Sequence, residues 1–251
     1  MIVLDVSTSG EPGITLDRVH FGYEEQGLLD GICWELDRGE NAVVTGSSGC
    51  GKSTLLQIAA GLLPPTQGSV LLSGHPLAKL LPSERVRRGL RTGFVFQDGG
   101  LFSNQDVYSN VSLALYYHQD VLGLDDEAVE RRTEEALEAA QISRQHWKTL
   151  PAHLPFGDRK RLALARAIAV APNFFYFDDP DVGMDQRTAR VTHQLLCQLR
   201  DDPDVTLMVA TNRTALIERL GVPGFRLEGG RITDQTRASS IPPSWRRSRS
   251  P

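Results

Sequence analysis

A glycine-rich segment in the first quarter of the chain has the residue types that a polyphosphate site needs. It lies between the apolar run 42–44 and the helical run 55–60. Glycine lets backbone N–H groups converge on phosphate oxygens at a helix N-terminus, where the helix dipole favours negative charge. Lys52 can then reach the β- and γ-phosphates, and Ser53 can offer its hydroxyl to Mg²⁺. Against the alternative of a chance glycine-rich turn, the spacing predicts a nucleoside triphosphate site formed by Gly46, Ser47, Ser48, Gly49, Cys50, Gly51, Lys52, Ser53 and Thr54.

A second group of candidate residues follows the apolar run 174–177, which is directly succeeded by Asp178 and Asp179. A carboxylate at the C-terminal end of a strand can hold Mg²⁺, and its neighbour can orient an attacking water molecule. Buried strands that end in Asp are common, so Asp178 and Asp179 alone would be moderate evidence for a nucleotide site. The glycine-rich loop in the same chain makes this evidence strong. Together they predict that Asp178 belongs to a metal site and that Asp179 orients water.

The elements that must position these residues follow an α/β pattern. Short apolar runs suit parallel strands buried on both faces, while the alternating segments 14–21 and 31–36 suit an antiparallel layer. Apolar residues recur at helical spacing over 110–142 and again over 159–169. These helices predict an inserted helical subdomain at about residues 100–170. The other strands are expected at 70–74, 93–96, 174–177 and 205–210, with a final hairpin over 225–232.

Composition excludes several classes of protein. The 251 residues include 27 Lys and Arg against 31 Asp and Glu, and this acidic balance argues against a nucleic-acid-binding surface. Cys33, Cys50 and Cys197 are odd in number and lack metal-site spacing, which favours reduced thiols in the cytoplasm. The first residues include the acidic Asp5 and lack the cationic region with which a secretion signal begins. No apolar run is long enough for a membrane span. We therefore expect a cytoplasmic protein.

The length suits one domain with a subdomain, which we place at residues 1–238. Residues 239–251 are rich in Ser, Pro and Arg and are expected to lack fixed structure. Trp245 and the neighbouring arginines could instead anchor the tail to a membrane surface or to another subunit, but the pattern favours a solvated tail. The six histidines have no mutual ligand spacing, so a metal cluster is not expected.

From about Ile14 to Thr233 the chain resembles the nucleotide-binding subunits of ABC transporters. This resemblance implies an α/β P-loop NTPase fold of ABC type, with a mixed central sheet, an antiparallel β layer and a helical subdomain. It also implies ATP and Mg²⁺ as cofactors. The motifs that carry the resemblance are the glycine-rich loop, Tyr23, Gln97, the segment Leu154–Asp158 ahead of the helix 162–168, Asp179-Pro180, and Asp185.

The resemblance implies roles for individual residues. Tyr23 would stack on adenine, and Gln97 would sense both Mg²⁺ and the membrane partner. Ser53, Gln97 and Asp178 would form the metal site, and Gly157 would contact the nucleotide of the opposite subunit. The implied partners are a transmembrane permease docked near 97–102 and a second nucleotide-binding subunit, with a homodimer expected. The protein would thus sit peripherally on the cytoplasmic face of the inner membrane.

Two stretches resemble one branch of this family, the ATPases of Mla-type systems. They are 96–102, followed by Val107 and Asn110, and the segment 179–185. Mla-type systems move phospholipids between bacterial membranes together with an MCE-domain protein and a permease. The resemblance implies phospholipid as cargo and an MCE-domain protein as a further partner.

The chain departs from the family at the signature segment, which elsewhere reads close to Leu-Ser-Gly-Gly-Gln. Pro155 removes both a hydroxyl and a backbone N–H from the serine position. Phe156 places a ring where glycine would allow close backbone approach. Gly157 is retained, and Asp158 brings negative charge toward a phosphate.

Two further departures concern hydrolysis. Asp179 stands where the family has the catalytic glutamate, and a side chain one methylene shorter can misplace the water by about 1 Å, at a cost of ~10²-fold in rate. Asn212 stands in place of the switch histidine, and its amide can donate to the γ-phosphate but carries no charge. Asp179 and Asn212 are the expected catalytic residues.

The altered positions have one thing in common, which is that each would act at the γ-phosphate. We therefore favour slow or absent hydrolysis by a protein that still binds ATP. Three alternatives stay open: a nucleotide-gated dimerisation or regulatory module without turnover, an ABC ATPase for another imported or exported substrate, and a soluble DNA-repair or translation ATPase. The acidic balance and the single nucleotide domain count against the last of these.

Overall fold

The computed structural model describes residues 12–24 and 26–236, so the predicted tail and Trp245 lie outside the described residues. Its centre is a six-stranded mixed sheet of order β10-β9-β3-β8-β7-β6. Neighbouring strands pair in parallel except β9 and β10, which form the predicted hairpin. The strands are β3 (Asn41–Thr45), β6 (Thr92–Val95), β7 (Phe174–Asp178), β8 (Thr206–Ala210), β9 (Gly224–Glu228) and β10 (Arg231–Thr236).

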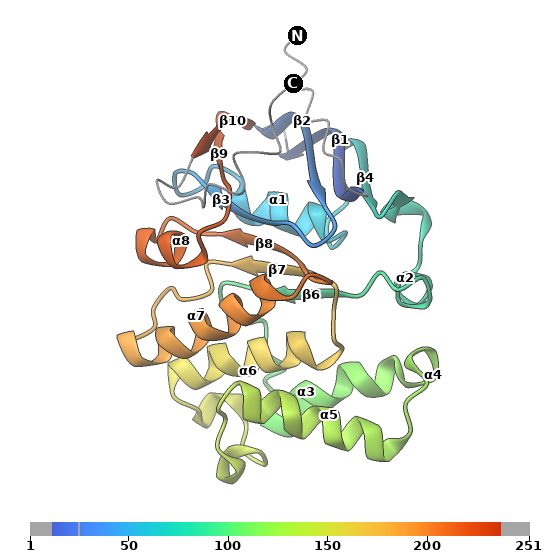
Figure 1. Ribbon diagram of the computed structural model, residues 1–251, viewed down its shortest axis with the longest axis vertical. Helices are drawn as coiled ribbons and strands as arrows, with labels where there is room; N and C mark the ends of the chain where they lie inside the picture. The colour runs from blue at the N-terminus through green and yellow to red at the C-terminus, as the bar shows by residue number, and fades with distance from the viewer. Residues whose placement is uncertain (1–11, 25, 237–251) are drawn as a thin grey trace.

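A second, four-stranded antiparallel sheet of order β2-β1-β4-β5 forms the predicted β layer. Its strands are β1 (Pro12–Tyr23), β2 (Gln26–Asp37), β4 (Gln67–Leu72) and β5 (His75–Pro76). Helix α1 (Lys52–Ala59) lies between this layer and the central sheet (Figure 1). A single apolar core joins the three, with Leu16, Leu56 and Tyr176 among its fully buried members. Because α1 is packed between the two sheets, its first turn is held next to the C-terminal end of β3.

The other face of the central sheet is covered by three helices, α6 (Phe156–Ala169), α7 (Gln186–Asp201) and α8 (Thr214–Leu220). A second apolar core fills this interface, with Phe175 and Phe177 of β7 packed against Leu164 of α6 and Leu196 of α7. The aromatic run 174–177 thus supplies both cores, since alternate rings point to opposite faces of the sheet.

The helical subdomain consists of α3 (Val107–Tyr117), α4 (Gln119–Leu122), α5 (Asp126–Ala139) and α6, around a core of its own. The run 110–142 is therefore three helices rather than one, because α3 ends at His118 and α4 ends at left-handed Gly123. Helix α6 begins at Phe156, three residues before the predicted start, and Pro155, with a non-helical ψ of 150°, is its N-cap residue.

Shorter helices complete the chain: α2 (Pro82–Arg87) and three 3₁₀ turns at Leu77–Lys79, Arg144–His146 and Pro151–His153. In the described ranges, no helix combines the length and apolar character needed to cross a bilayer.

Candidate nucleotide site

The glycine-rich loop joins β3 to α1, as its sequence predicts. Gly46, Gly49 and Gly51 have φ values of 149°, 77° and 106°, which L side chains rarely adopt. A Cβ on Gly46 would lie 2.4 Å from the carbonyl oxygen of Leu227 on β9, so glycine is also required there by close packing. The loop therefore presents its backbone rather than side chains.

Two side chains converge on the carbonyl oxygen of Gly46. The Lys52 ammonium donates to it at 2.9 Å and to the Ser47 carbonyl at 3.0 Å. The Asn212 amide nitrogen donates to the same Gly46 carbonyl at 2.7 Å, while its oxygen accepts from the Gly46 N–H at 3.0 Å. Asn212 was expected to offer its amide to a γ-phosphate, but here both amide atoms bind the loop backbone. Two side chains that a polyphosphate would meet are thus bonded to the loop backbone.

The predicted metal-site residues come together at one cavity of about 580 Å³, lined by Ser53, Gln97 and Asp178. The Ser53 hydroxyl donates to Asp178 Oδ1 at 2.9 Å, which places two oxygen ligands side by side. Burial raises the pKa of Asp178, opposed by the Ser53 hydrogen bond and the charges of Lys52 and Lys160. Hydroxyl, carboxylate and amide oxygens suit Mg²⁺, so the donor set fits the ion.

Asp179, the expected water-orienting residue, has a φ of 43°, in the left-handed region that is unfavourable for non-glycine residues. Its N–H donates to the carbonyl oxygen of Ala210 at the end of β8, which holds this conformation. Strain of this kind is concentrated at functional sites, where the surrounding structure maintains it. The half-buried Asp179 directly follows Asp178, which lines the cavity.

Tyr23 lies over the start of α1. Its hydroxyl is 3.5 Å from the Thr54 hydroxyl, and its ring packs edge-on against Phe21 at 5.0 Å between centroids. Tyr23 is 57% exposed, so it is accessible to a ligand beside the loop. Tyr23 thus occupies a place from which it can stack on a base. Ser47, Ser48 and Gly49 form the exposed rim of the same loop, with half-buried Cys50 behind them.

The signature segment makes several contacts within its own chain. The Phe156 ring lines the cavity of its own chain together with Ser53 and Asp178. It also packs on Gly183, where a Cβ would lie 2.9 Å from the ring. Gly157 packs against Thr188 of α7, because a Cβ there would lie 2.6 Å from the threonine methyl group. The retained glycine therefore has a packing role within this chain.

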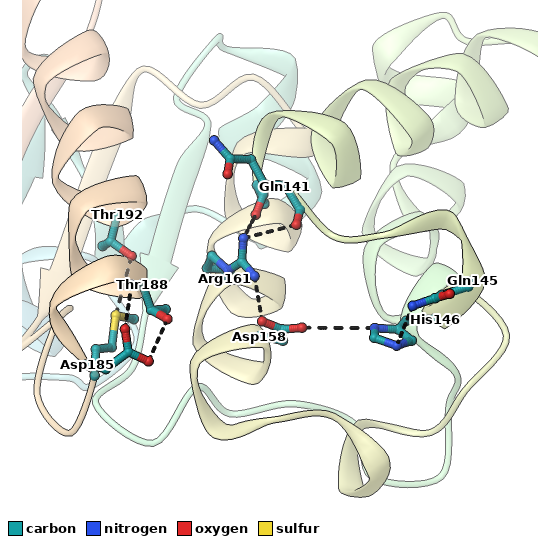
Figure 2. A network of polar contacts seen from close by, with 10 residues as sticks. Gln141, Gln145, His146, Asp158, Arg161, Asp185, Thr188 and Thr192 are labelled. Carbon is teal, nitrogen blue, oxygen red and sulfur yellow. Dashed lines mark hydrogen bonds and ion pairs between the residues drawn. The ribbon is translucent and has the colours of Figure 1, made fainter.

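Asp158 was expected to bring negative charge toward a phosphate, but its carboxylate is paired within the subdomain. Arg161 Nη2 donates to Oδ1 at 2.5 Å, and His146 Nδ1 lies 4.0 Å from Oδ2 (Figure 2). Arg161 in turn donates to the carbonyl oxygens of Ala140 and Gln141 after α5. Arg161 thus attaches α6 to the C-terminal end of α5, while Asp158 holds this arginine in place and has its charge compensated by it.

Sequence reasoning missed two charged groups beside the site. Lys160 is 4% exposed and its ammonium donates to the Gln97 carbonyl oxygen. Asp181 is buried between His193 on α7 and Arg213, the residue after Asn212. The sequence carried a signal for each group. Lys160 interrupts an otherwise apolar helix face, and Asp181 is a third carboxylate closely following Asp178 and Asp179.

Comparison with known proteins agrees with this geometry. A family model described as ABC transporter matches residues 29–182. The sulfate/thiosulfate import ATP-binding protein CysA of Burkholderia mallei is 32% identical over 202 residues, which are 80% of this chain and 55% of CysA. The methionine import ATP-binding protein MetN of Photorhabdus laumondii is 30% identical over 213 residues, 85% of this chain and 61% of MetN. The chain thus spans little more than half the length of these relatives.

A third relative is nearer in length. The probable amino-acid ABC transporter ATP-binding protein y4tH of Sinorhizobium fredii is 30% identical over 231 residues, 88% of each chain. The fold matches the dimeric post-hydrolysis state of the ATP-binding cassette MJ0796 bound to ADP and Pi, with a TM-score of 0.81 and 26% identity over 90% of this chain and 99% of that one. Because the family model spans more than half of the sequence and its motifs form one site, the chain belongs to the ABC transporter family as an ATP-binding domain.

Proposed function

We propose that this chain is the ATP-binding subunit of a membrane transporter, in which ATP binding and hydrolysis drive movement of a solute. The observation that supports it most is the Ser53–Asp178 pair at the cavity, directly after the loop whose backbone binds the Lys52 ammonium. ATP would place its phosphates on the loop N–H groups at the start of α1, with Tyr23 beside the adenine.

Magnesium would be held by Ser53, Asp178 and Gln97, whose oxygens fit the ion. When bound, it neutralises charge on the phosphates. Asp179 would orient the attacking water. Lys52 would leave the Gly46 carbonyl and bind the β- and γ-phosphates.

We further propose that a cytoplasmic helix of the permease docks in a groove between the helical subdomain and β6. This cavity of about 720 Å³ is lined by Leu62, Phe94, Phe102, Leu113, Ala114 and Tyr117. Tyr117 is 71% exposed at its edge, and Arg166 supplies a cation among the lining residues. An amphipathic helix suits such a groove, because its apolar face fills the cavity while its polar face meets the rim.

The partner subunit in this proposal is a second copy of the chain, in line with the dimeric ATP-binding cassette that shares its fold. For the cargo we propose a small solute taken into the cell. The relatives are named for import of sulfate or thiosulfate, of methionine and of amino acids, and none of these names supports the phospholipid or MCE-domain interpretation.

Hydrolysis is proposed to be slow. Pro155 gives α6 no side-chain cap, Phe156 lies in the cavity of its own chain, and both amide atoms of Asn212 are occupied by Gly46. The second candidate is a nucleotide-gated module that dimerises without turnover, which the same observations also favour.

One preparation tests both candidates. The chain is affinity-purified from native membranes under gentle detergent, its co-purifying proteins are identified, and ATP turnover of the complex is measured. A permease together with slow turnover is the expected result. Recovery without a permease would reject the transporter, and a permease with no turnover would favour the nucleotide-gated module.

A further inference from the structure

Lys160 is a buried cation that belongs to the helical subdomain but faces the nucleotide site. It lies on the second turn of α6, and its ammonium donates to the backbone carbonyl oxygen of Gln97, two residues beyond the end of β6 at Val95. The Phe156 ring lies beside it, with its centroid 5.8 Å from Nζ. Burial lowers the pKa of Lys160, so the ammonium is held there against a desolvation penalty.

Four carboxylates offset this penalty. They are Asp98 after β6, Asp178 and Asp179 at the end of β7, and Asp181 in the following loop. Gln97 and Phe156, which both contact Lys160, line the same cavity as Ser53 and Asp178, and this places the Lys160 ammonium beside the acidic cluster. The cluster is also where Ser53 and Asp178 bring together oxygen ligands for a cation. Lys160 therefore lies within the electrostatic range of the metal site without being a ligand.

We propose that Lys160 is the resident counter-ion of the magnesium site: it balances Asp178 and its neighbours before nucleotide arrives, and it sets how tightly the divalent ion binds. This inference rests on the proposed magnesium site. A fixed positive charge near a bound divalent cation weakens binding of that cation by Coulomb repulsion, most strongly where water is excluded. Lys160 is accordingly a positioning residue and not a ligand, and through the Gln97 carbonyl it also fixes the backbone that carries a metal-site amide.

Charge and hydrogen bond can be separated with three substitutions. Lys160→Gln removes the charge and keeps an N–H donor for the Gln97 carbonyl. Lys160→Met removes both, and Lys160→Arg keeps both. Arg159→Gln is the matched control, because it removes the same unit of charge from an exposed neighbour on the same helix.

The experiment measures Mn²⁺ binding to the full chain in saturating ADP, by the electron paramagnetic resonance signal of free Mn²⁺. ADP affinity in EDTA shows that each variant retains the folded nucleotide site. We expect Lys160→Gln and Lys160→Met to tighten Mn²⁺ binding by roughly tenfold. Lys160→Arg and the exposed control should stay within about twofold, because solvent and salt screen the charge of Arg159.

The results also distinguish failure of this inference from failure of the metal site. Wild-type protein that binds ADP but no Mn²⁺, or an Asp178→Asn variant that binds Mn²⁺ normally, would reject the magnesium site and the role of Lys160 with it. Normal wild-type binding with no change in Lys160→Gln would reject the counter-ion alone. A change confined to Lys160→Met would assign Lys160 to backbone support through its hydrogen bond.

Discussion

Asp181 and His193 form a buried polar pair between the loop after β7 and helix α7. His193 Nε2 and Asp181 Oδ2 are 2.9 Å apart, and the Asp181 side chain is 2% exposed. The other carboxylate oxygen lies 3.5 Å from Nε of Arg213, next to Asn212. One carboxylate thus ties α7 to the two loops that carry Asp179 and Asn212.

Loss of the His193 ring should destabilise the fold. His193→Ala leaves Asp181 desolvated without its hydrogen-bond partner, which costs about 1–3 kcal/mol. For a chain of this length each kcal/mol lowers Tm by about 2–4 °C, so calorimetry should show a drop of several degrees. His193→Gln keeps a donor and should recover part of it. Exposed His153→Ala is the control, and an equal Tm for all variants would mean that the pair adds no stability.

Lys52 should be essential for nucleotide binding. Lys52→Ala removes the ammonium that now binds the Gly46 and Ser47 carbonyls and would bind phosphate. Hydrogen bonds to charged groups contribute about 1.5–3 kcal/mol, and we expect ATP affinity to fall roughly 100-fold in a fluorescent-nucleotide titration. Exposed Lys79→Ala should bind as wild type does. Equal affinities in both variants would contradict the phosphate role of the loop.

Tyr23 should contribute through its ring. Tyr23→Ala is expected to weaken ATP binding by about 1–3 kcal/mol, the range for stacking of a base on an aromatic ring. Tyr23→Phe keeps the ring and removes only the hydroxyl near Thr54, so it should bind almost normally. If the phenylalanine variant is the weaker one, the hydroxyl rather than the ring is responsible.

Asn212 should support the phosphate loop. Asn212→Ala removes both hydrogen bonds to Gly46, and we expect ATP binding to weaken by about 1 kcal/mol, roughly fivefold. Asn212→Asp keeps the acceptor but adds negative charge near the phosphates, so it should bind more weakly than the alanine variant. Exposed Asn104→Ala is the control. Isothermal titration measures the ATP affinity of each variant. If the alanine variant binds ATP more tightly than wild type does, support of the loop is not the role of Asn212.

Hydrolysis should be repaired only when both halves of a composite site are changed. Asp179→Glu with Asn212→His alters one half, and Pro155→Ser with Phe156→Gly alters the half presented to a partner. In a homodimer each pair alone leaves every site damaged, so the combined variant should gain more than the sum of both. Steady-state turnover of the membrane complex measures this. Wild-type turnover within about 1–10³ per second, unimproved by either pair, would show the substitutions to be harmless.

The phosphate loop could be predicted because its conformation is local. The glycines, Lys52 and Ser53 are adjacent in sequence, and the flanking strand and helix follow from apolar periodicity. The central sheet could be predicted for the same reason, since β7 and β8 read as continuous apolar runs.

The contacts of Asn212 and Lys160 could not be predicted, because each depends on the approach of distant segments. Asn212 reaches Gly46 across 166 residues, and Lys160 reaches Gln97 across 63. The pairing of Asp158 with Arg161 is local, at a spacing of three residues on a helix, and could have been anticipated once α6 was extended to Phe156.

Arg166 of α6 lines the proposed docking groove and contacts the segment that follows β6. Its guanidinium donates to the carbonyl oxygens of Gly100 at 2.7 Å and Gly99 at 3.0 Å, and it lies 5.6 Å from the Phe102 ring centroid. Together with Lys160 on Gln97, it attaches the whole stretch 97–102 to α6, although this stretch leaves the central sheet. Any movement of α6 would therefore carry the stretch 97–102 with it, so that a helix docked in the groove and the Gln97 of the metal site would be coupled through α6.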